Sequence, residues 1–220
     1  VNGDGLADLI VSSSQVDPNL GGDTGLSYVV FGKTSGTAVN AGDVALGTGG
    51  FAINGPGYRV SNAGDVNGDG YADLLVSSIL SDPAAGANAG RSYVVFGKST
   101  TTNIDLSAVA AGTGGFVVNG QAASDGSGAT LSALGDVNGD GYADLGVFAY
   151  GGASKAFVIY GSSDATRTNL DISGGTLAPS LGFTITGLTS TSSNTRLSSA
   201  GDMNGDGLND YILGSPGADK

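Results

Sequence analysis

Residues 65–73 read Asp-Val-Asn-Gly-Asp-Gly-Tyr-Ala-Asp, and this acidic loop decides the fold because it recurs along the chain. Taking the Asp of its Asn-Gly-Asp-Gly core as a marker gives Asp4, Asp69, Asp140 and Asp206, which are 65, 71 and 66 residues apart. A period of this length is the signature of a repeat architecture in which each repeat is one supersecondary unit. We therefore expect an array of similar units.

Other segments repeat in step with the loop. Ser-Tyr-Val-Val-Phe-Gly-Lys occupies residues 27–33 and 92–98, and Gly-Thr-Gly-Gly-Phe occupies residues 47–51 and 112–116, so both pairs are offset by the same 65 residues. In the third unit, the related run Ala-Phe-Val-Ile-Tyr-Gly stands at 156–161. The expected repeat units are approximately residues 1–65, 66–136, 137–202 and 203–220, the last being incomplete.

Within a unit, four short strand-like runs lie between Gly- and Asp-rich turns. In the second unit they are residues 58–63, 72–78, 91–97 and 115–119, and the acidic loop joins the first run to the second. Four antiparallel strands per repeat predict a blade of a β-propeller, with the loop at the tip of a hairpin. A β-helix is the alternative, but its repeats are much shorter.

The runs amount to a unit without its first strand, two complete units and two strands of a fourth. Propellers usually close with about four to eight blades. About three blades are therefore expected here, as part of a larger ring that the rest of a longer chain or other copies would complete.

Composition supports the all-β prediction and excludes several functions. Gly accounts for 41 of 220 residues, and the 20 acidic residues are all Asp, which favours turns over helices. The net charge of -12 with eight basic residues argues against a nucleic-acid partner, and no apolar run is long enough for membrane insertion. The absence of Cys, His and Glu removes most acid, base and nucleophile options, which predicts a noncatalytic protein.

Without Cys or His, any metal must be held by oxygen, and the loop offers such oxygens at alternate positions. In the clearest copy, Asp65, Asn67 and Asp69 supply side-chain oxygens, Tyr71 supplies its backbone carbonyl, and Asp73 closes the cage. Calcium accepts roughly six to eight oxygens in flexible geometry, whereas magnesium requires a tighter octahedron. A single copy could be a mere hairpin turn, but four copies in register favour Ca²⁺ as the cofactor.

The predicted metal ligands occupy corresponding positions in all four loops, and the first copy retains only part of the motif. They are Asn2, Asp4, Leu6 and Asp8; Asp65, Asn67, Asp69, Tyr71 and Asp73; Asp136, Asn138, Asp140, Tyr142 and Asp144; and Asp202, Asn204, Asp206, Leu208 and Asp210. The Glu that closes an EF-hand at its twelfth position is missing, and a strand is expected where that motif starts a helix. Eleven of the 20 Asp residues lie in these loops, so bound metal would offset their mutual repulsion.

These motifs resemble FG-GAP repeats. The resemblance rests on Phe-Gly at 31–32 and 96–97, on Gly-Asp-Val-Asn-Gly-Asp-Gly-Tyr-Ala-Asp-Leu starting at 64 and 135, and on Gly-Ser-Pro-Gly-Ala at 214–218. Residues 77–79 and 148–150 depart from the Gly-Ala-Pro element of the family, and Tyr160-Gly161 replaces Phe-Gly. The resemblance implies the β-propeller of integrin α chains and of many bacterial surface and secreted proteins, with calcium in the loop between the first two strands of a blade.

Three functions remain open. The first is a noncatalytic, secreted or cell-surface adhesion module with structural calcium and an unidentified protein or glycan ligand. The second is a structural element of a larger surface or appendage protein. The third is the scaffold part of a secreted hydrolase, which the missing catalytic residue types disfavour.

Overall fold

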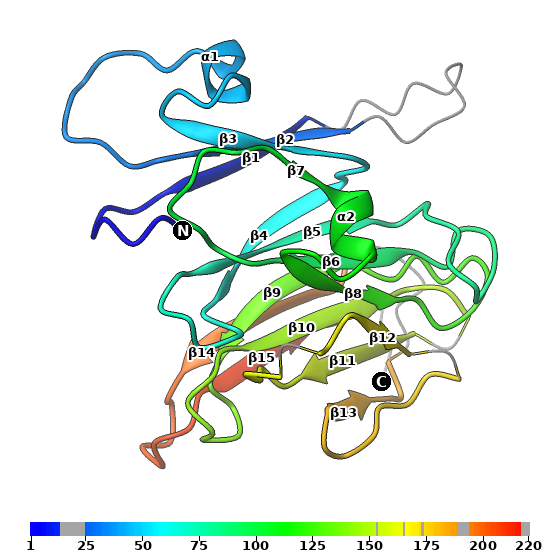
Figure 1. Ribbon diagram of the computed structural model, residues 1–220. Helices are drawn as coiled ribbons and strands as arrows, with labels where there is room; N and C mark the ends of the chain where they lie inside the picture. The colour runs from blue at the N-terminus through cyan, green and yellow to red at the C-terminus, as the bar shows by residue number, and fades with distance from the viewer. Residues whose placement is uncertain (14–24, 153, 165, 173, 189–193, 217–220) are drawn as a thin grey trace.

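The computed structural model describes residues 1–220 apart from 14–24, 153, 165, 173, 189–193 and 217–220. Its strands form a series of sheets that follow one another along the chain, from β1, β2 and β3 at the top of Figure 1 towards β14 and β15 below. In the described part of the chain, no helix combines the length and the apolar character needed to cross a membrane.

Each sheet is a blade built mainly from strands consecutive in sequence. The first blade contains β1 (Leu9–Ser13), β2 (Leu26–Val30) and β3 (Gly50–Asn54), and the second contains β4 (Arg59–Gly64), β5 (Asp73–Ser78), β6 (Arg91–Val95) and β8 (Gly115–Asn119). The third contains β9 (Thr130–Gly135), β10 (Asp144–Ala149), β11 (Lys155–Ile159) and β13 (Gly182–Ile185), and the fourth contains β14 (Arg196–Gly201) and β15 (Asp210–Gly214). The pairing of these consecutive strands is antiparallel throughout. The predicted all-β propeller with four-stranded blades is confirmed, and the ring is not closed.

Two outer strands come from the following unit, which the sequence did not indicate. The short strand β7 (Ile104–Asp105) pairs parallel with β3, and β12 (Asn169–Asp171) pairs parallel with β8. Asn103 strengthens the first junction, since its Oδ1 accepts from the Ala52 amide at 2.9 Å and its Nδ2 donates to the Ala45 carbonyl at 2.9 Å. Neighbouring blades are thus joined by backbone pairing as well as by packing.

Two five-residue helices, α1 (Ala41–Ala45) and α2 (Leu106–Ala110), precede the last strands of the first two blades, where only loops were expected. Val44 in α1 is buried, and so are Leu106 and Val109 in α2. Residues three apart lie on one face of a helix, so this spacing covers the sheet edge with apolar side chains. A helix of five residues is too short to show a recognisable hydrophobic period among the surrounding turns, so the sequence did not predict these two helices.

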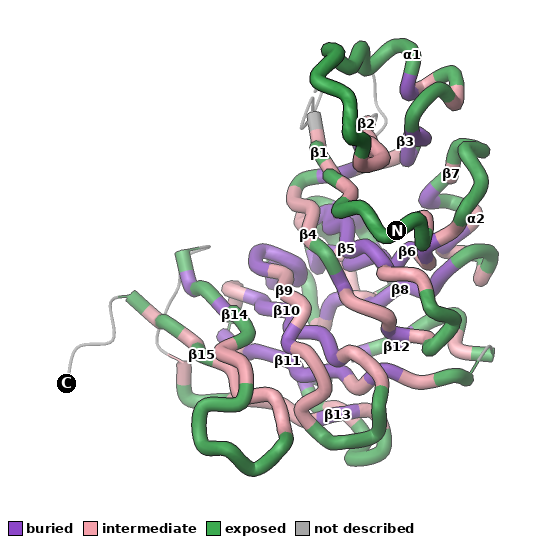
Figure 2. The backbone as a smooth tube through the Cα atoms, turned by 90° about the vertical axis from the view of Figure 1, so that its left-hand side faces the viewer, coloured by how far each residue is buried: buried purple, intermediate pink, exposed green. Residues whose placement is uncertain are grey.

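The hydrophobic core lies between blades. β5 and β10 are buried along their whole length, and Leu75, Phe116, Leu145 and Phe157 belong to one cluster that joins the second and third blades. Figure 2 shows burial concentrated in these middle blades, while the outer blades are more exposed. Leu9 in β1 and Ile212 in β15 are 59% and 64% exposed, as expected where a ring is open.

Candidate metal-binding loops

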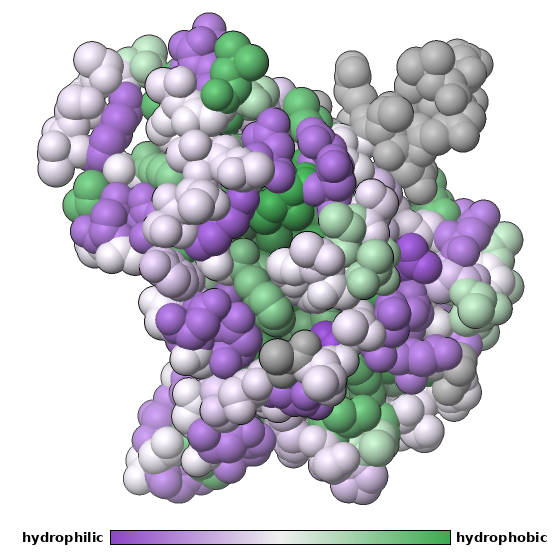
Figure 3. Space-filling model, viewed as in Figure 1, coloured by the Kyte–Doolittle hydropathy of each residue, from purple (hydrophilic) through white to green (hydrophobic). Residues whose placement is uncertain are grey.

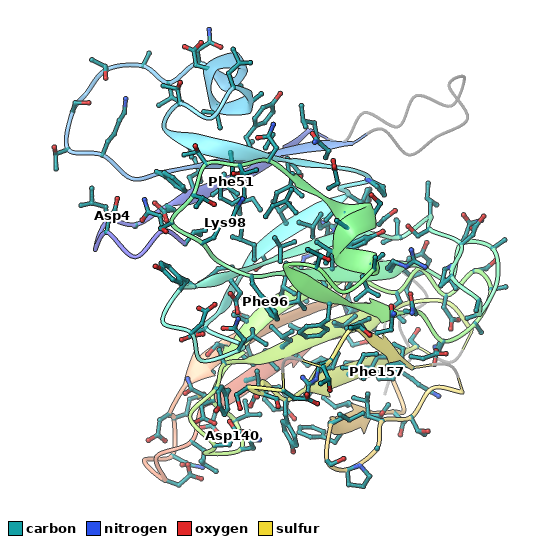
Figure 4. All side chains as sticks on the ribbon, in the orientation of Figure 1. Asp4, Phe51, Phe96, Lys98, Asp140 and Phe157 are labelled. Atoms are coloured by element: carbon teal, nitrogen blue, oxygen red, sulfur yellow. The ribbon has the colours of Figure 1, made fainter. Side chains whose placement is uncertain are left out.

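The acidic loops connect the two innermost strands of successive blades, β4 to β5, β9 to β10 and β14 to β15. The pairing register shifts just before each loop, between Asn62 and Gly64 in the second blade. Such a β-bulge adds one residue, which bends the strand and starts the turn. Asp4 and Asp140, from the first and third loops, lie along the same side of the molecule (Figure 4), and hydrophilic residues gather along that side in Figure 3.

The first acidic residue of the loop organises its backbone. Asp65 accepts from the amides of Gly68 and Asp69 with Oδ1, at 2.8 and 3.1 Å, and from Gly70 with Oδ2 at 2.9 Å. Asp136 and Asp202 make the same three contacts in their own loops. This shared set of bonds holds the loop in one conformation at three places in the chain.

The middle residues extend this pattern. Asn67 Oδ1 accepts from the Asp69 amide at 3.0 Å, and Asp69 Oδ1 accepts from the Tyr71 amide at 2.9 Å. The third and fourth loops repeat both bonds. In the first loop, Asn2 and Asp4 do the same. The fifth-position Asp is exposed in every loop, and the third-position Asn is exposed in the last two loops and half-buried in the first two, so oxygen lone pairs at these positions are accessible to a cation.

The last acidic residue of the loop is buried and ties the loop to the third strand. Asp73 is 0% exposed; its Oδ2 accepts from Val66 and its Oδ1 from Gly97, both at 2.8 Å. Asp144 makes the equivalent bonds to Val137 and Gly161. A Cβ at Gly97 would lie 2.6 Å from the Ala72 carbonyl oxygen, so only glycine fits here.

This clamp explains a pattern whose purpose was not recognised in the sequence. The Phe-Gly pairs recur in register with the loops because the glycine amide binds the last Asp of the loop. The available signal was the equal spacing of 24 residues from Asp8 to Gly32 and from Asp73 to Gly97, whereas the separation from Asp144 to Gly161 is 17 residues. In the described part of the fourth blade, Asp210 keeps the loop contact, to the Met203 amide at 2.8 Å.

Burial makes the closing carboxylates hard to ionise. The pKa of Asp73 is raised to about 7, first by burial and then by the negative charges of Asp69 and Asp65, although the Gly97 and Val66 amides lower it. The pKa of Asp144 is raised to about 6 for the same reasons, with Asp140 and Asp136 as the neighbouring charges. Among the described residues, no basic side chain forms an ion pair with either carboxylate.

Asp8 holds the corresponding position in the first loop. Its Oδ1 accepts from the Gly32 amide at 2.8 Å, as Asp73 accepts from Gly97, and its Oδ2 accepts from the Asn2 amide at 3.1 Å. The clamp between the loop and the third strand is therefore present in the first blade as well.

The loop residues fit a hard cation in chemistry, although they do not form a carboxylate cage as they stand. In the described ranges, no three acidic side chains converge as a ready metal site, because the carboxylates face loop amides. Each carboxylate oxygen has two lone pairs, and the remaining donors, the Asn67 amide and the Tyr71 carbonyl, are also oxygens. This all-oxygen set with an unneutralised buried carboxylate matches the preference of calcium.

Successive loops are also in contact. The Ala143 amide donates to the Asp65 carbonyl at 2.9 Å, and the Asn209 amide donates to the Asp136 carbonyl at 2.8 Å. The position-seven side chain of each loop lies against the fourth-position glycine of the loop before it, as for Tyr142 on Gly68 and Leu208 on Gly139. The loops thus form one connected row across the blades.

Antiparallel blades with an acidic hairpin loop between their innermost strands define a propeller of repeated blades. Residues 56–95 and 127–163 match the FG-GAP repeat, so the chain carries FG-GAP repeats in two places. It is 32% identical over 174 residues to Integrin alpha-PS5 of Drosophila melanogaster, a match covering 74% of this chain and 15% of that protein. The resemblance drawn from the sequence is confirmed, and the chain spans about 15% of this integrin-like relative.

Proposed function

We propose that this chain is part of a noncatalytic, extracellular β-propeller module that uses structural calcium and binds a protein or glycan ligand in an adhesive role. The observation that carries the calcium part is the buried Asp73, which has no ion-pair partner among the described residues and lies near the charges of Asp65 and Asp69. Asp144 lies in the same way near Asp140 and Asp136, although the positive charge of Arg167 also acts on it. A divalent cation would supply the missing positive charge. The ligands would be the oxygen donors of each loop named above, with Tyr71 and Tyr142 offering backbone carbonyls.

Calcium in this position would act on the fold. Asp65 shapes the loop, and Asp73 joins it to Gly97, two residues after β6, so neutralising the cluster would strengthen the connection between three strands of a blade. Because the loops are in contact across blades, the effect would extend along the row. The extracellular location and the adhesive role are inferred from the similarity to an integrin α chain, and the FG-GAP class is generally noncatalytic.

A thermal unfolding experiment tests the calcium proposal. Calcium that binds the folded loops stabilises the folded state. If the dissociation constant is well below 1 mM, the melting temperature in millimolar Ca²⁺ should be about 5 to 10 °C higher than in excess chelator. Magnesium at the same concentration should have a smaller effect, since it demands a tighter octahedron. Equal melting temperatures in chelator and calcium would refute the proposal.

The exposed outer blades favour a second candidate, a structural element within a larger surface or appendage protein. Leu9 and Ile212 expose apolar surface on strands at the two open ends of the blade series. We infer that further blades, from a longer chain or from other copies, cover these edges. The third candidate, a hydrolase scaffold, has no specific observation in its favour.

A further inference from the structure

A cavity of about 330 Å³ lies where the innermost strands of three blades begin. Strands β4, β9 and β14 are neighbours, and each runs from this cavity to its acidic loop, so the cavity and the loops lie at opposite ends of these strands. The cavity is lined by Tyr58, Arg59, Val60, Ser61, Thr130, Leu131, Arg196 and Leu197. It is therefore separate from the candidate metal loops.

The charge of the cavity is opposite to that of the molecule. Two of the eight basic residues of the chain, Arg59 and Arg196, line it, and none of its lining residues is acidic. Eleven of the 20 Asp residues lie in the loops at the far ends of the strands. In a protein of net charge -12, this concentration of positive charge favours an anionic ligand in the cavity.

Arg59 has an unused hydrogen-bond donor. Its guanidinium carbon lies 5.1 Å from the centre of the Tyr58 ring, and its Nε is buried without a partner among the described residues. A buried donor without an acceptor is costly, which suggests that an acceptor from outside the chain fills the position. The planar guanidinium presents its donors in a fork that matches a carboxylate.

Arg196 is held in place on the other side of β9. Its Nη1 donates to the Thr195 carbonyl at 3.0 Å, and the Thr130 hydroxyl donates to the same carbonyl at 2.6 Å. This shared acceptor joins the starts of β9 and β14. The two arginines therefore lie on strands that flank Thr130, on a packed sheet scaffold.

We propose that this cavity binds a carboxylate-bearing sugar residue. Arg59 and Arg196 would bind the carboxylate, Ser61 and Thr130 offer hydroxyls to sugar hydroxyls, and the partly exposed Tyr58 ring offers an apolar face to the sugar ring. A cavity of this size accommodates one sugar ring. The inference specifies the ligand class of the proposed binding role and rests on that role, but it is independent of calcium.

Backbone amide NMR of the 220-residue chain, titrated with glucuronate in saturating calcium, tests the proposal. Saturable shifts confined to residues 58–61, 130–131 and 195–197 are expected with glucuronate, and none with glucose, which lacks the carboxylate. Both Arg59→Gln and Arg196→Gln should weaken glucuronate binding by roughly tenfold, because each removes a charge-assisted hydrogen bond. Lys33→Gln is the matched control, since it removes one positive charge at a residue outside the cavity and should leave the affinity unchanged.

Several outcomes would overturn the proposal. Three results would exclude a carboxylated-sugar site: no saturable shifts, an affinity for glucuronate in both arginine variants equal to that of the unaltered chain, or binding of acetate or sulfate as tight as that of glucuronate. Tighter binding of an N-acetyl aspartate amide than of glucuronate would assign the cavity to an acidic protein side chain instead. Because folding and calcium response are read from the same spectra without ligand, failure of the cavity proposal is distinguishable from failure of the calcium proposal.

Discussion

The aromatic ring of Tyr142 packs against Gly68, and a Cβ added to Gly68 would lie 2.5 Å from the Cε1 atom of Tyr142. Tyr142 is at the seventh position of the third loop, and Gly68 is at the fourth position of the second loop. Tyr71 lies on Gly3 in the same way, at 2.9 Å. The residue whose backbone carbonyl is a proposed metal ligand therefore also contacts the preceding loop with its side chain.

Gly68→Ala should destabilise the fold through this contact. Gly68 has a φ of 74°, which strains any residue with a Cβ, and the new methyl would also displace Tyr142. We expect a loss of about 2 to 4 kcal/mol in the free energy of unfolding, measured by chemical denaturation in calcium. Gly70→Ala is the matched control, because its φ is 89° but no atom lies within 4 Å of its Cβ. Equal losses in the two variants would show that the Tyr142 contact contributes nothing.

Asp69→Asn separates calcium binding from simple charge repulsion. Removing one charge should stabilise the calcium-free protein slightly, because Asp69 raises the pKa of the buried Asp73, and should reduce the stabilisation by calcium by about 1 to 2 kcal/mol. Melting temperatures with calcium and with chelator give both quantities. Asp43→Asn in α1 removes the same charge outside the loops and should leave the calcium response unchanged. A full calcium response in Asp69→Asn would contradict the assignment of this ligand.

Much of this arrangement was predictable from sequence, and the rest depends on contacts that sequence periodicity does not contain. The four copies of the acidic loop predicted the blades and their hairpins, since a nine-residue motif at a regular period leaves few alternatives. The clamp from Asp73 to Gly97 was not anticipated, because it joins positions 24 residues apart that are brought together by strand pairing. The parallel pairing of β7 with β3 was also missed, since two residues carry no recognisable strand pattern.

The cavity between β4, β9 and β14 illustrates the same limit. Arg59 and Arg196 belong to the second and fourth blades, and the third blade has Thr130 in the corresponding place, so no repeated motif marks the site. Only the packing of the innermost strands brings the two positive charges to one cavity. Repetition therefore identified the scaffold, whereas the candidate ligand site lies where the units differ.

Without calcium, stability should fall as pH rises from about 4 to about 7. The folded-state pKa values of Asp73, about 7, and Asp144, about 6, are above the ordinary value of 3.8, so the folded protein binds more protons than the unfolded chain in this range. The stabilisation that these two carboxyl groups contribute is complete below the unfolded-state pKa. It is lost as pH rises through the folded-state pKa values. With saturating calcium the trend should reverse, because the metal binds the ionised carboxylates. Denaturant titrations at several pH values, with chelator and with calcium, measure both slopes; a chelated protein that gains stability from pH 5 to 7 would contradict the raised pKa values.

Asn103→Ala should weaken the junction between the first two blades. Asn103 lies just before β7, and its amide joins the Ala52 backbone in β3 to the Ala45 carbonyl in α1, so truncation removes two hydrogen bonds and leaves the Ala52 N–H without this acceptor. A loss of about 1 to 3 kcal/mol is expected. Hydrogen exchange should locate the effect, with faster exchange at β3 amides and unchanged exchange at β10, which lies in the third blade. Ser35→Ala is the control, because among the described residues the Ser35 hydroxyl bonds only to the exposed Thr37 hydroxyl. Uniform acceleration across all blades would instead mean that the junction is part of the global unfolding unit, and the local role proposed for Asn103 would be wrong.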